Sequence, residues 1–276
     1  MRKKHRWILP VLAMLVILML IALDERLILR TYTVVSPKLT AEVRLAVVTD
    51  FHSSDNADDV VAMVASCAPD AVLLVGDLFD DDTQNRPTER TLSLMRQLSA
   101  QYPCYYVSGN HEAWTGEMDA LYQQTEEAGV TVLRMSSGVL IVRGQRIALC
   151  GIPDPYEMVF SGAPDTEEQL QQALEDVDSA DFTVLLAHRP ELLAKYAQFP
   201  LDLVVSGHAH GGQVRIPGVL NGLYAPNQGW FPKLAGGAYA QGGTTLIVSR
   251  GLAVRTRLPR IFNRPEVVLV RCVPAE

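Results

Sequence analysis

Short β-rich runs alternate with helical patterns from residue 40 onward, which restricts this chain to folds that pack helices against sheets. The hydrophobic patterns predict strands at residues 45–49, 71–75, 104–108, 130–133, 139–143, 146–150, 182–187, 203–206, 244–249 and 267–272. They predict helices near residues 57–66, 88–99, 117–128, 167–177 and 191–197. Gly144-Gln145 is expected to form a hairpin turn. The first half follows a βαβα order and the second is mostly β, which favours an α/β fold of stacked sheets with helices outside them.

Residues 40–276 contain no internal repeat, low-complexity tract or long linker, so we expect one compact domain there. The 276-residue chain is 48% hydrophobic and can bury a sizeable core. Its formal net charge of −7 argues against a nucleic-acid binder that relies on a broadly basic surface. The four widely spaced cysteines form no C-x-x-C pair, so we expect them to be small core residues: Cys67, Cys104, Cys150 and Cys272.

Residues 1–30 are expected to form a membrane anchor. A basic cluster (Arg2, Lys3, Lys4 and Arg6) precedes an uncharged apolar run at residues 8–23. The run does not end in small residues of the A-x-A type, which favours an uncleaved single-pass transmembrane helix over a cleaved signal peptide. It also lacks the polar stripe of a helix that belongs to a folded domain. The basic flank predicts a cytoplasmic amino terminus and an extracytoplasmic domain.

Five predicted strands end in polar clusters that contain five of the six histidines. The clusters are TD-FH with Asp50 and His52, GD-LFD with Asp77, GNHE with Asn110 and His111, AH-RP with His188, and GHAH with His208 and His210. Each cluster alone also fits a turn or a helix cap. Ligands of open α/β sheets bind beyond the carboxyl ends of the strands, so the joint occurrence of the clusters predicts one shared site.

The residue types in these clusters favour a metal centre. Aspartate and neutral imidazole form a mixed donor set that suits manganese, iron or zinc, and one carboxylate can bridge two such ions. Asp50 and His52 are two residues apart, as are His208 and His210, so each pair shares a face of an extended strand or converges through a local turn. The neighbouring acidic run Asp80–Asp82 is either solvated surface or part of a cation site.

In order, the clusters resemble the motifs of the calcineurin-like metallophosphoesterases: D-x-H, G-D-x-x-D, G-N-H-E, H and G-H-x-H. The resemblance extends over residues 43–272 and implies a four-layer α/β/β/α sandwich of two mixed sheets. Within this superfamily, the segments GHAHGGQVRIPG, VSRGL and FNRPEV resemble a membrane-associated subgroup that has an amino-terminal hydrophobic segment. Some members of that subgroup cleave the pyrophosphate of UDP-2,3-diacylglucosamine, and others are general phosphodiesterases.

The same resemblance implies a role for each clustered residue. Two divalent ions are expected, with Mn²⁺ preferred and iron or Zn²⁺ as alternatives, and a hydroxide shared by the ions would attack phosphorus. His111 would stay unmetallated, oriented by Glu112, and would donate a proton to the leaving oxygen. Asp80 would support the ligands without binding metal. The implied ligands are Asp50, His52 and His210 for the first ion, Asn110, His188 and His208 for the second, and Asp77 as the bridge.

The substrate stays open at this point. We expect a phosphodiester or pyrophosphate near the membrane, linked to a lipid or a nucleotide, and no nucleic-acid or protein partner. One alternative is a specific UDP-2,3-diacylglucosamine pyrophosphate hydrolase, and another is a non-catalytic metal-binding scaffold. The aromatic residues Trp230, Phe231 and Tyr239 suit either substrate contact or core packing. Seven basic residues near the carboxyl end suit a solvated surface, contact with anionic headgroups, or a second phosphate: Arg215, Lys233, Arg250, Arg255, Arg257, Arg260 and Arg264.

Overall fold

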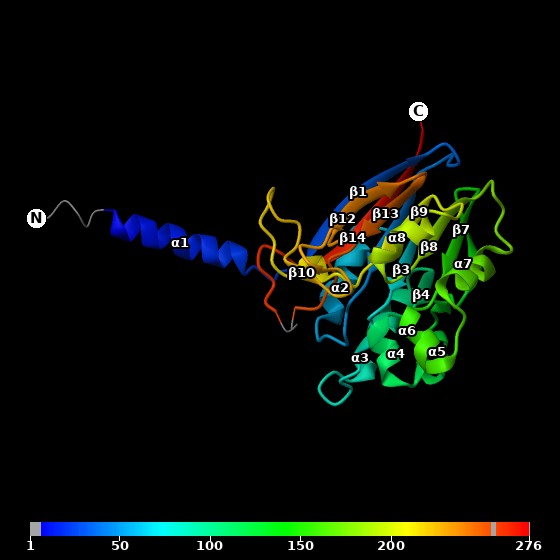
Figure 1. Cartoon of the computed structure of the whole chain (residues 1–276), viewed down its shortest axis with the longest axis horizontal. Coiled ribbons are helices and arrows are strands. Elements are labelled where there is room, and N and C mark those ends of the chain that lie inside the picture. Colours follow the sequence, from blue (N-terminus) through cyan, green and yellow to red (C-terminus); the bar gives the residue numbers. More distant parts are fainter. Residues whose placement is uncertain (1–6, 255–257, 276) are drawn as a thin grey trace, which may run out of the picture.

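The computed structural model describes residues 7–254 and 258–275 and contains two six-stranded mixed sheets (Figure 1). In spatial order, the first sheet consists of β1 (Ile28–Ser36), β14 (Glu266–Pro274), β2 (Val43–Val48), β3 (Ala71–Val75), β4 (Cys104–Val107) and β5 (Thr131–Val132). The second consists of β12 (Gly237–Gln241), β13 (Thr244–Val248), β9 (Leu203–Ser206), β8 (Phe182–Leu186), β7 (Gln145–Gly151) and β6 (Ser136–Val142). A separate two-stranded ribbon pairs β10 (Tyr224–Ala225) with β11 (Gly229–Trp230).

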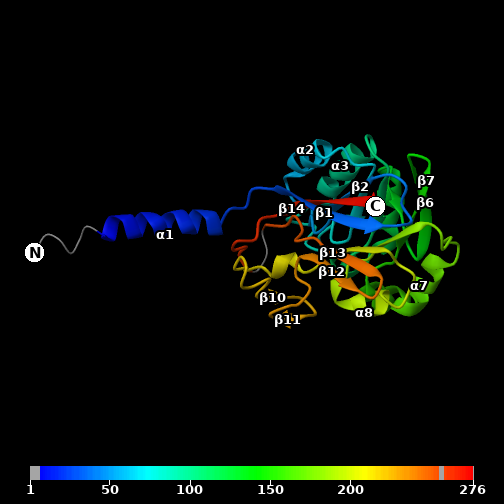
Figure 2. The same cartoon turned by 90° about the horizontal axis from the view of Figure 1, so that it is seen from above.

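Helices cover the outer faces of both sheets. The α-helices are α1 (Ile8–Ala22), α2 (Ala57–Ser66), α3 (Thr88–Ser99), α4 (Asn110–Thr115), α5 (Met118–Glu127), α6 (Pro155–Ser161), α7 (Thr166–Leu174) and α8 (Leu193–Tyr196). Two short 3₁₀ turns, η1 (Pro190–Leu192) and η2 (His210–Gly212), follow strands of the second sheet. Figure 2 shows α2 and α3 outside the first sheet and α7 and α8 outside the second. The predicted α/β fold with two mixed sheets is confirmed.

Three apolar layers hold this arrangement together. Side chains of a strand alternate between its two faces, so Leu45 and Leu73 point into the layer between the sheets, whereas Ala46 and Leu74 face the helices. The third layer lies under α7 and α8 and includes Leu185. The predicted role of the four cysteines as core residues is confirmed, since all four are free and buried.

Parallel pairing positions the site. In the first sheet β2, β3 and β4 run parallel to one another, and in the second β7, β8, β9 and β13 do the same. Neighbouring parallel strands end at the same edge of their sheet, so the loops that follow β2, β3 and β4 are brought together, as are those that follow β8, β9 and β13. The polar clusters found in the sequence occupy these loops.

The expected hairpin between β6 and β7 is present, with its turn one residue earlier than predicted. Arg143 and Gly144 form the turn with φ of 49° and 79°, the left-handed conformation that a two-residue hairpin loop favours. The long connection between β9 and β13 contains η2, β10, β11 and β12. Trp230 and Phe231 in this connection are 65% and 67% exposed, so core packing does not explain them.

The expectation of a single-pass membrane anchor is wrong. The apolar run forms the 15-residue helix α1, which is exposed at all residues except Ala22 and projects away from the sheets (Figures 1 and 2). At 1.5 Å per residue such a helix is about 22 Å long, short of a hydrocarbon core of about 30 Å. Within residues 7–254 and 258–275, no helix combines the length and the apolar character that crossing a membrane requires. The basic residues Arg2, Lys3, Lys4, Arg6, Arg255 and Arg257 lie outside the described residues.

Candidate metal centre

Asp77 lies between the two groups of predicted ligands. It follows β3, and its Oδ2 is 3.1 Å from His188 Nε2 and 3.8 Å from His52 Nε2. Its Oδ1 accepts the backbone N–H of His111 at 2.9 Å. One buried carboxylate therefore faces residues from both sheets, which is the position that a bridging ligand needs.

Asp50, His52 and His210 form the first group. One possible ligand atom of each lies within 4.8 Å of those of the other two, and all three residues are buried. His210 Nε2 is 3.7 Å from Asp50 Oδ1, and Asp50 also accepts the backbone N–H of His208 at 3.1 Å. The loop after β2 is thereby joined to the loop after β9.

Asp77, His188 and His208 form the second group, again with ligand atoms within 4.8 Å of one another. His188 Nδ1 donates to the Val75 carbonyl at 2.8 Å, which turns Nε2 toward Asp77. His208 Nε2 lies 2.9 Å from Asn227 Oδ1. This contact occupies one nitrogen of His208 and leaves Nδ1 to bind a metal.

Arg189 supports the second group and was not identified from the sequence. Its Nη1 lies 3.1 Å from His208 Nε2, and its Nη2 donates to Asp154 Oδ1 at 2.9 Å. Arg189 and Asp154 are both buried. The sequence signal was limited to an arginine directly after a predicted ligand, which a strand end explains equally well.

The backbone at the site is held in a conformation that side chains other than glycine seldom adopt. Five of the seven predicted ligands have positive φ: Asp50 (52°), His52 (47°), Asp77 (52°), His208 (65°) and His210 (46°). Left-handed backbone costs about 1–2 kcal/mol for such a residue. Strain of this kind clusters at functional sites because the surrounding structure must enforce it.

The donor atoms of the site fit bound cations. Among the described residues, three buried atoms of the predicted ligands have no hydrogen-bond partner: His52 Nε2, Asn110 Oδ1 and His210 Nδ1. Leaving a buried polar atom without a partner is costly, so a concentration of such atoms in one place needs an explanation. Asn110 begins α4, between two residues that contact Asp77. The clustered histidines and aspartates suit a centre of two divalent ions.

The protonation states of the histidines and of Asp77 agree with a centre that binds cations. Burial lowers the pKa of His208 and His210 well below the ordinary value, so both imidazoles are neutral and keep a lone pair for a metal. Burial would raise the pKa of Asp77, but the nearby histidines, His188 first, hold it well below its usual range. Burial would lower the pKa of His188, yet the Asp77 carboxylate raises it to about 10. A cation bound here would displace the proton of His188.

His111 lies beside the two groups, but Glu112 does not orient it. Its Nδ1 is 2.6 Å from Asp81 Oδ1, and its ring packs against the His52 ring with centroids 4.3 Å apart. Glu112 is buried and accepts the backbone N–H groups of Asp77, Leu78, Phe79 and Gly109 at 2.7–3.1 Å. Asp81, and not Glu112, therefore orients the His111 imidazole. Glu112 instead fixes the loop that carries Asp77.

Asp80 contacts the predicted ligand His52. Its Oδ2 lies 3.0 Å from His52 Nδ1 and accepts Arg86 Nη1 at 2.9 Å. Burial would raise the pKa of Asp80, but its bonds to His52 and to the backbone N–H of Asp82 lower it to about 2. An ionised Asp80 holds the proton of His52 on Nδ1 and leaves Nε2 free for a metal.

Gly251 must lack a side chain because Asp50 packs against it. A Cβ at Gly251 would lie 2.6 Å from the Asp50 Cβ, and φ at this position is 70°. We expect Gly251→Ala to displace the Asp50 carboxylate, weaken metal binding at least about tenfold and lower the free energy of unfolding by about 3 kcal/mol, through overpacking added to backbone strain. Isothermal titration with Mn²⁺ and urea denaturation measure the two effects.

Gly242→Ala is the matched control. Gly242 has a similar φ of 60°, but a Cβ there would meet nothing within 4 Å. Only the backbone cost of about 1–2 kcal/mol should remain, with metal affinity unchanged. Equal losses of stability and of metal affinity in the two variants would show that contact with Asp50 does not determine the need for glycine at position 251.

Comparisons with known proteins agree with this geometry. The family model of the calcineurin-like phosphoesterases matches residues 43–212. The chain is 29% identical over 225 residues to the uncharacterized metallophosphoesterase YkuE of Bacillus subtilis (strain 168), covering 80% of this chain and 73% of that protein. It is 28% identical over 219 residues to the phosphodiesterase YaeI of Escherichia coli (strain K12), covering 78% and 74%.

Solved structures share the fold at low sequence identity. The NAD nucleotidase NadN of Haemophilus influenzae aligns with a TM-score of 0.56 and 15% identity. The alignment covers 77% of this chain and 46% of that protein. The protein TT1561 of Thermus thermophilus aligns with a TM-score of 0.53 and 15% identity, covering 78% of this chain and 92% of that one. The family match covers more than half of the sequence and includes every predicted ligand. The chain belongs to the calcineurin-like phosphoesterase family and is a metal-dependent phosphoric ester hydrolase.

Proposed function

We propose that this protein hydrolyses phosphodiesters at a centre of two divalent ions, with Mn²⁺ as the preferred metal. The observation that carries this proposal is the group of buried ligand atoms that lack hydrogen-bond partners around Asp77 among the described residues. In the proposed assignment, the first ion binds Asp50, His52 and His210, the second binds Asn110, His188 and His208, and Asp77 bridges them. Bound divalent ions supply Lewis acidity toward phosphate oxygens and lower the pKa of a water molecule.

His111 is the proposed general acid. Its side chain is 25% exposed and lines a cavity of about 660 Å³ that also includes His52 and His210. Asp81, 2.6 Å from Nδ1, holds the imidazole so that Nε2 is the nitrogen available to the substrate. Burial would lower the pKa of His111, but Asp77 and Asp81 raise it. A proton on Nε2 can therefore pass to the oxygen of the leaving group.

The cavity also suits an ester group of apolar or aromatic character. Trp114, Tyr224, Pro226 and Leu258 line it together with the histidines. Trp114 and Tyr224 are 43% and 38% exposed, and the Trp114 ring lies against that of His111 with centroids 4.7 Å apart. Such an aromatic surface would hold the second ester group of a diester, which a monoester lacks. The name of the E. coli relative, a phosphodiesterase, supports the same preference.

Turnover of two aryl esters tests the proposal. The purified chain would be loaded with Mn²⁺, Fe²⁺ or Zn²⁺ and assayed on bis(4-nitrophenyl) phosphate and on 4-nitrophenyl phosphate. We expect the diester to be hydrolysed with at least about tenfold higher kcat/KM, since the aromatic surface adds about 1.4 kcal/mol or more of transition-state binding. Faster turnover of the monoester, or no turnover by protein shown to contain metal, would contradict the proposal.

A narrower substrate follows from the GHAHGGQVRIPG, VSRGL and FNRPEV segments. These segments resemble a subgroup of which some members cleave UDP-2,3-diacylglucosamine, and we propose this molecule as the narrower substrate. Its pyrophosphate is a diester-like anhydride linked to both a lipid and a nucleotide. This proposal predicts a kcat/KM for UDP-2,3-diacylglucosamine well above that for bis(4-nitrophenyl) phosphate. Equal or slower hydrolysis would leave the general phosphodiesterase activity and exclude the glycolipid as the preferred substrate.

A further inference from the structure

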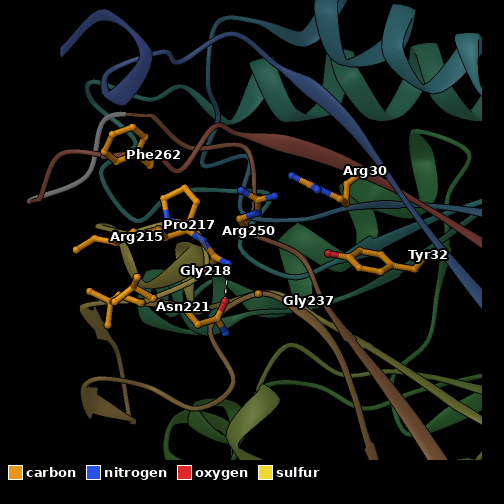
Figure 3. Close-up of a pocket in the computed structure, with 13 residues that line it drawn as sticks. Arg30, Tyr32, Arg215, Pro217, Gly218, Asn221, Gly237, Arg250 and Phe262 are labelled. Atoms are coloured by element: carbon orange, nitrogen blue, oxygen red, sulfur yellow. Dashed lines mark hydrogen bonds between the residues drawn. The ribbon is translucent and has the colours of Figure 1, made fainter. Parts of the chain in front are cut away.

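A second cavity, of about 540 Å³, is lined by arginines from three separate segments. Arg30, Arg215 and Arg250 surround it together with Tyr32 and Asn221 (Figure 3). Within the described part of the chain, it has no lining residue in common with the cavity that contains His111. Its volume lies within the range of small-molecule sites in proteins.

The fold brings these side chains together for identifiable reasons. Arg30 and Tyr32 are two residues apart on β1, so they point to the same face of that strand. Arg250 follows β13, and Arg215 follows η2. A Cβ at Gly236 would lie 2.8 Å from Arg250 Cγ and 3.2 Å from Arg215 Nη1, so the absence of a side chain at Gly236 is what lets both arginines reach this cavity.

The positive charge in this cavity is only partly compensated. Arg250 Nε lies 2.8 Å from Glu266 Oε2, and Arg30 Nε lies 3.7 Å from the same oxygen. Arg215 makes no ion pair with any residue that the structure describes; its guanidinium donates to the Gly211 carbonyl and to Asn221 Oδ1. Arg30 and Arg250 therefore share one carboxylate and Arg215 pairs with none, which leaves an excess of two positive charges among the three guanidinium groups.

Burial makes the unpaired charge of Arg215 unfavourable, whereas the Arg30 side chain is 44% exposed. Burial, together with the charge of Arg250, lowers the pKa of Arg215. Burial raises the pKa of Tyr32, so its phenol keeps the proton and can donate it to a ligand. Figure 3 shows the Tyr32 hydroxyl pointing toward the arginines. Charged groups in such a setting are normally paired, and guanidinium groups pair best with the planar or tetrahedral oxygens of an oxyanion.

We propose that this cavity is a phosphate-binding site distinct from the metal centre, in which Arg30, Arg215 and the Tyr32 hydroxyl donate to the phosphate oxygens. Arg250, fixed by Glu266, contributes charge from the base of the cavity. The ligand is either free phosphate or a phosphate group on a larger molecule. The site does not depend on the proposed reaction, because its occupancy can be measured without turnover.

Contacts connect this phosphate site to the metal centre. Arg215 Nη1 donates at 3.3 Å to the carbonyl of Gly211, the residue after His210. Arg250 precedes Gly251, which packs against Asp50. A phosphate held by both arginines would therefore sit next to the backbone that positions two ligands of the first ion. This proximity allows either a substrate with a second phosphate or a phosphate that stabilises the centre.

A phosphate titration tests the site. Isothermal titration of the metal-loaded full chain with inorganic phosphate should show two binding sites in the wild type and one in Asp77→Asn, in which the metal centre is disabled. Adding Arg215→Gln to Asp77→Asn should weaken the remaining site at least about tenfold, because a charge-assisted hydrogen-bond pair is lost. Arg146→Gln is the matched control: this half-exposed arginine pairs with Asp181 elsewhere, and its loss should change the affinity less than about twofold.

A crystal soak gives a second measurement that does not rely on the Asp77 variant. Tungstate, which replaces phosphate, should produce anomalous density between Arg30, Arg215 and Arg250 in wild-type crystals. An empty cavity in the soaked crystal, or phosphate affinity unaffected by Arg215→Gln, would overturn the proposal. The KM of Arg215→Gln shows where the bound phosphate comes from. If KM rises at least about tenfold only for substrates that carry a second phosphate, the site binds the second phosphate of the substrate. If KM changes equally for all substrates, the site binds free phosphate.

Discussion

Replacing Asp77 with asparagine is expected to lower kcat/KM for bis(4-nitrophenyl) phosphate by at least about 10³, since the carboxylate proposed to bridge the two ions, worth several kcal/mol of charge stabilisation, is lost. Oδ2 of Asp77 faces both His52 and His188, and an amide in its place removes the negative charge that would hold two cations in the proposed assignment. The fold should persist, because the Asn carbonyl oxygen can still accept the N–H of His111. Inductively coupled plasma mass spectrometry gives the metal content of the variant, and kinetics on the same sample give its kcat/KM.

Asp119→Asn provides the control for that substitution. Asp119, on α5, is 93% exposed, pairs with Arg134 and belongs to none of the ligand groups among the described residues. Its neutralisation should change kcat/KM less than about twofold, as expected for an exposed ion pair. An Asp77→Asn variant that keeps both ions and most of its activity would show that Asp77 is not the bridge.

The second large effect is expected for His111→Ala, and it should depend on the leaving group. Loss of a general acid costs about 10²–10⁴ in rate when the leaving oxygen is strongly basic, so hydrolysis of an alkyl ester should fall by about 10³. A 4-nitrophenolate leaving group needs little protonation and should lose less than about tenfold. Both ions should remain bound, because His111 is not among the proposed ligands.

Asp81→Asn separates the proposed acid role of His111 from its positioning. Asp81 contacts His111 Nδ1 and is itself 42% exposed, so the variant should retain the acid but hold it less firmly. We expect an alkyl-ester rate about tenfold below that of the wild type, between the wild type and His111→Ala. Equal losses for alkyl and aryl esters in His111→Ala, or the loss of metal from that variant, would contradict the role of His111 as an acid.

The clustered ligands were predictable because their positions follow from strand ends. Asp50, Asp77 and His188 each come after a short apolar strand, and parallel strands must end at one edge. Helices α2 and α3 were predicted with their observed bounds because apolar residues recur along each at helical spacing. The ligand assignment itself stays a proposal, since it requires metal to be observed.

The residues that support the ligands were not predictable from sequence. Asp81 lies in a run of three aspartates, and no pattern distinguishes the one that reaches His111 from its neighbours. Arg189 contacts Asp154, which is 35 residues away, and such a contact appears only after folding. Glu112 was placed beside His111 because it follows it in sequence, but on the short helix α4 successive side chains point in different directions, and Glu112 faces the Asp77 loop instead.

The sequence patterns did not predict two strands of the large sheets, because both strands lie at sheet edges. β1 and β12 are edge strands, and one face of each is largely exposed. Edge strands such as Gly237–Gln241 lack the continuous apolar run by which central strands are identified. The amino-terminal run illustrates the opposite error, because a basic flank before an uncharged apolar run suggested a membrane span that the 15-residue α1 does not provide.

The position of metal ions around Asp77 tests the account most directly. Crystals of the Mn²⁺-loaded chain, measured for anomalous scattering, should show two peaks about 3.5–4 Å apart with the Asp77 carboxylate between them. The ion at one peak should be bound by Asp50, His52 and His210, and the ion at the other peak by Asn110, His188 and His208. A single peak, or two peaks away from Asp77, would contradict the account.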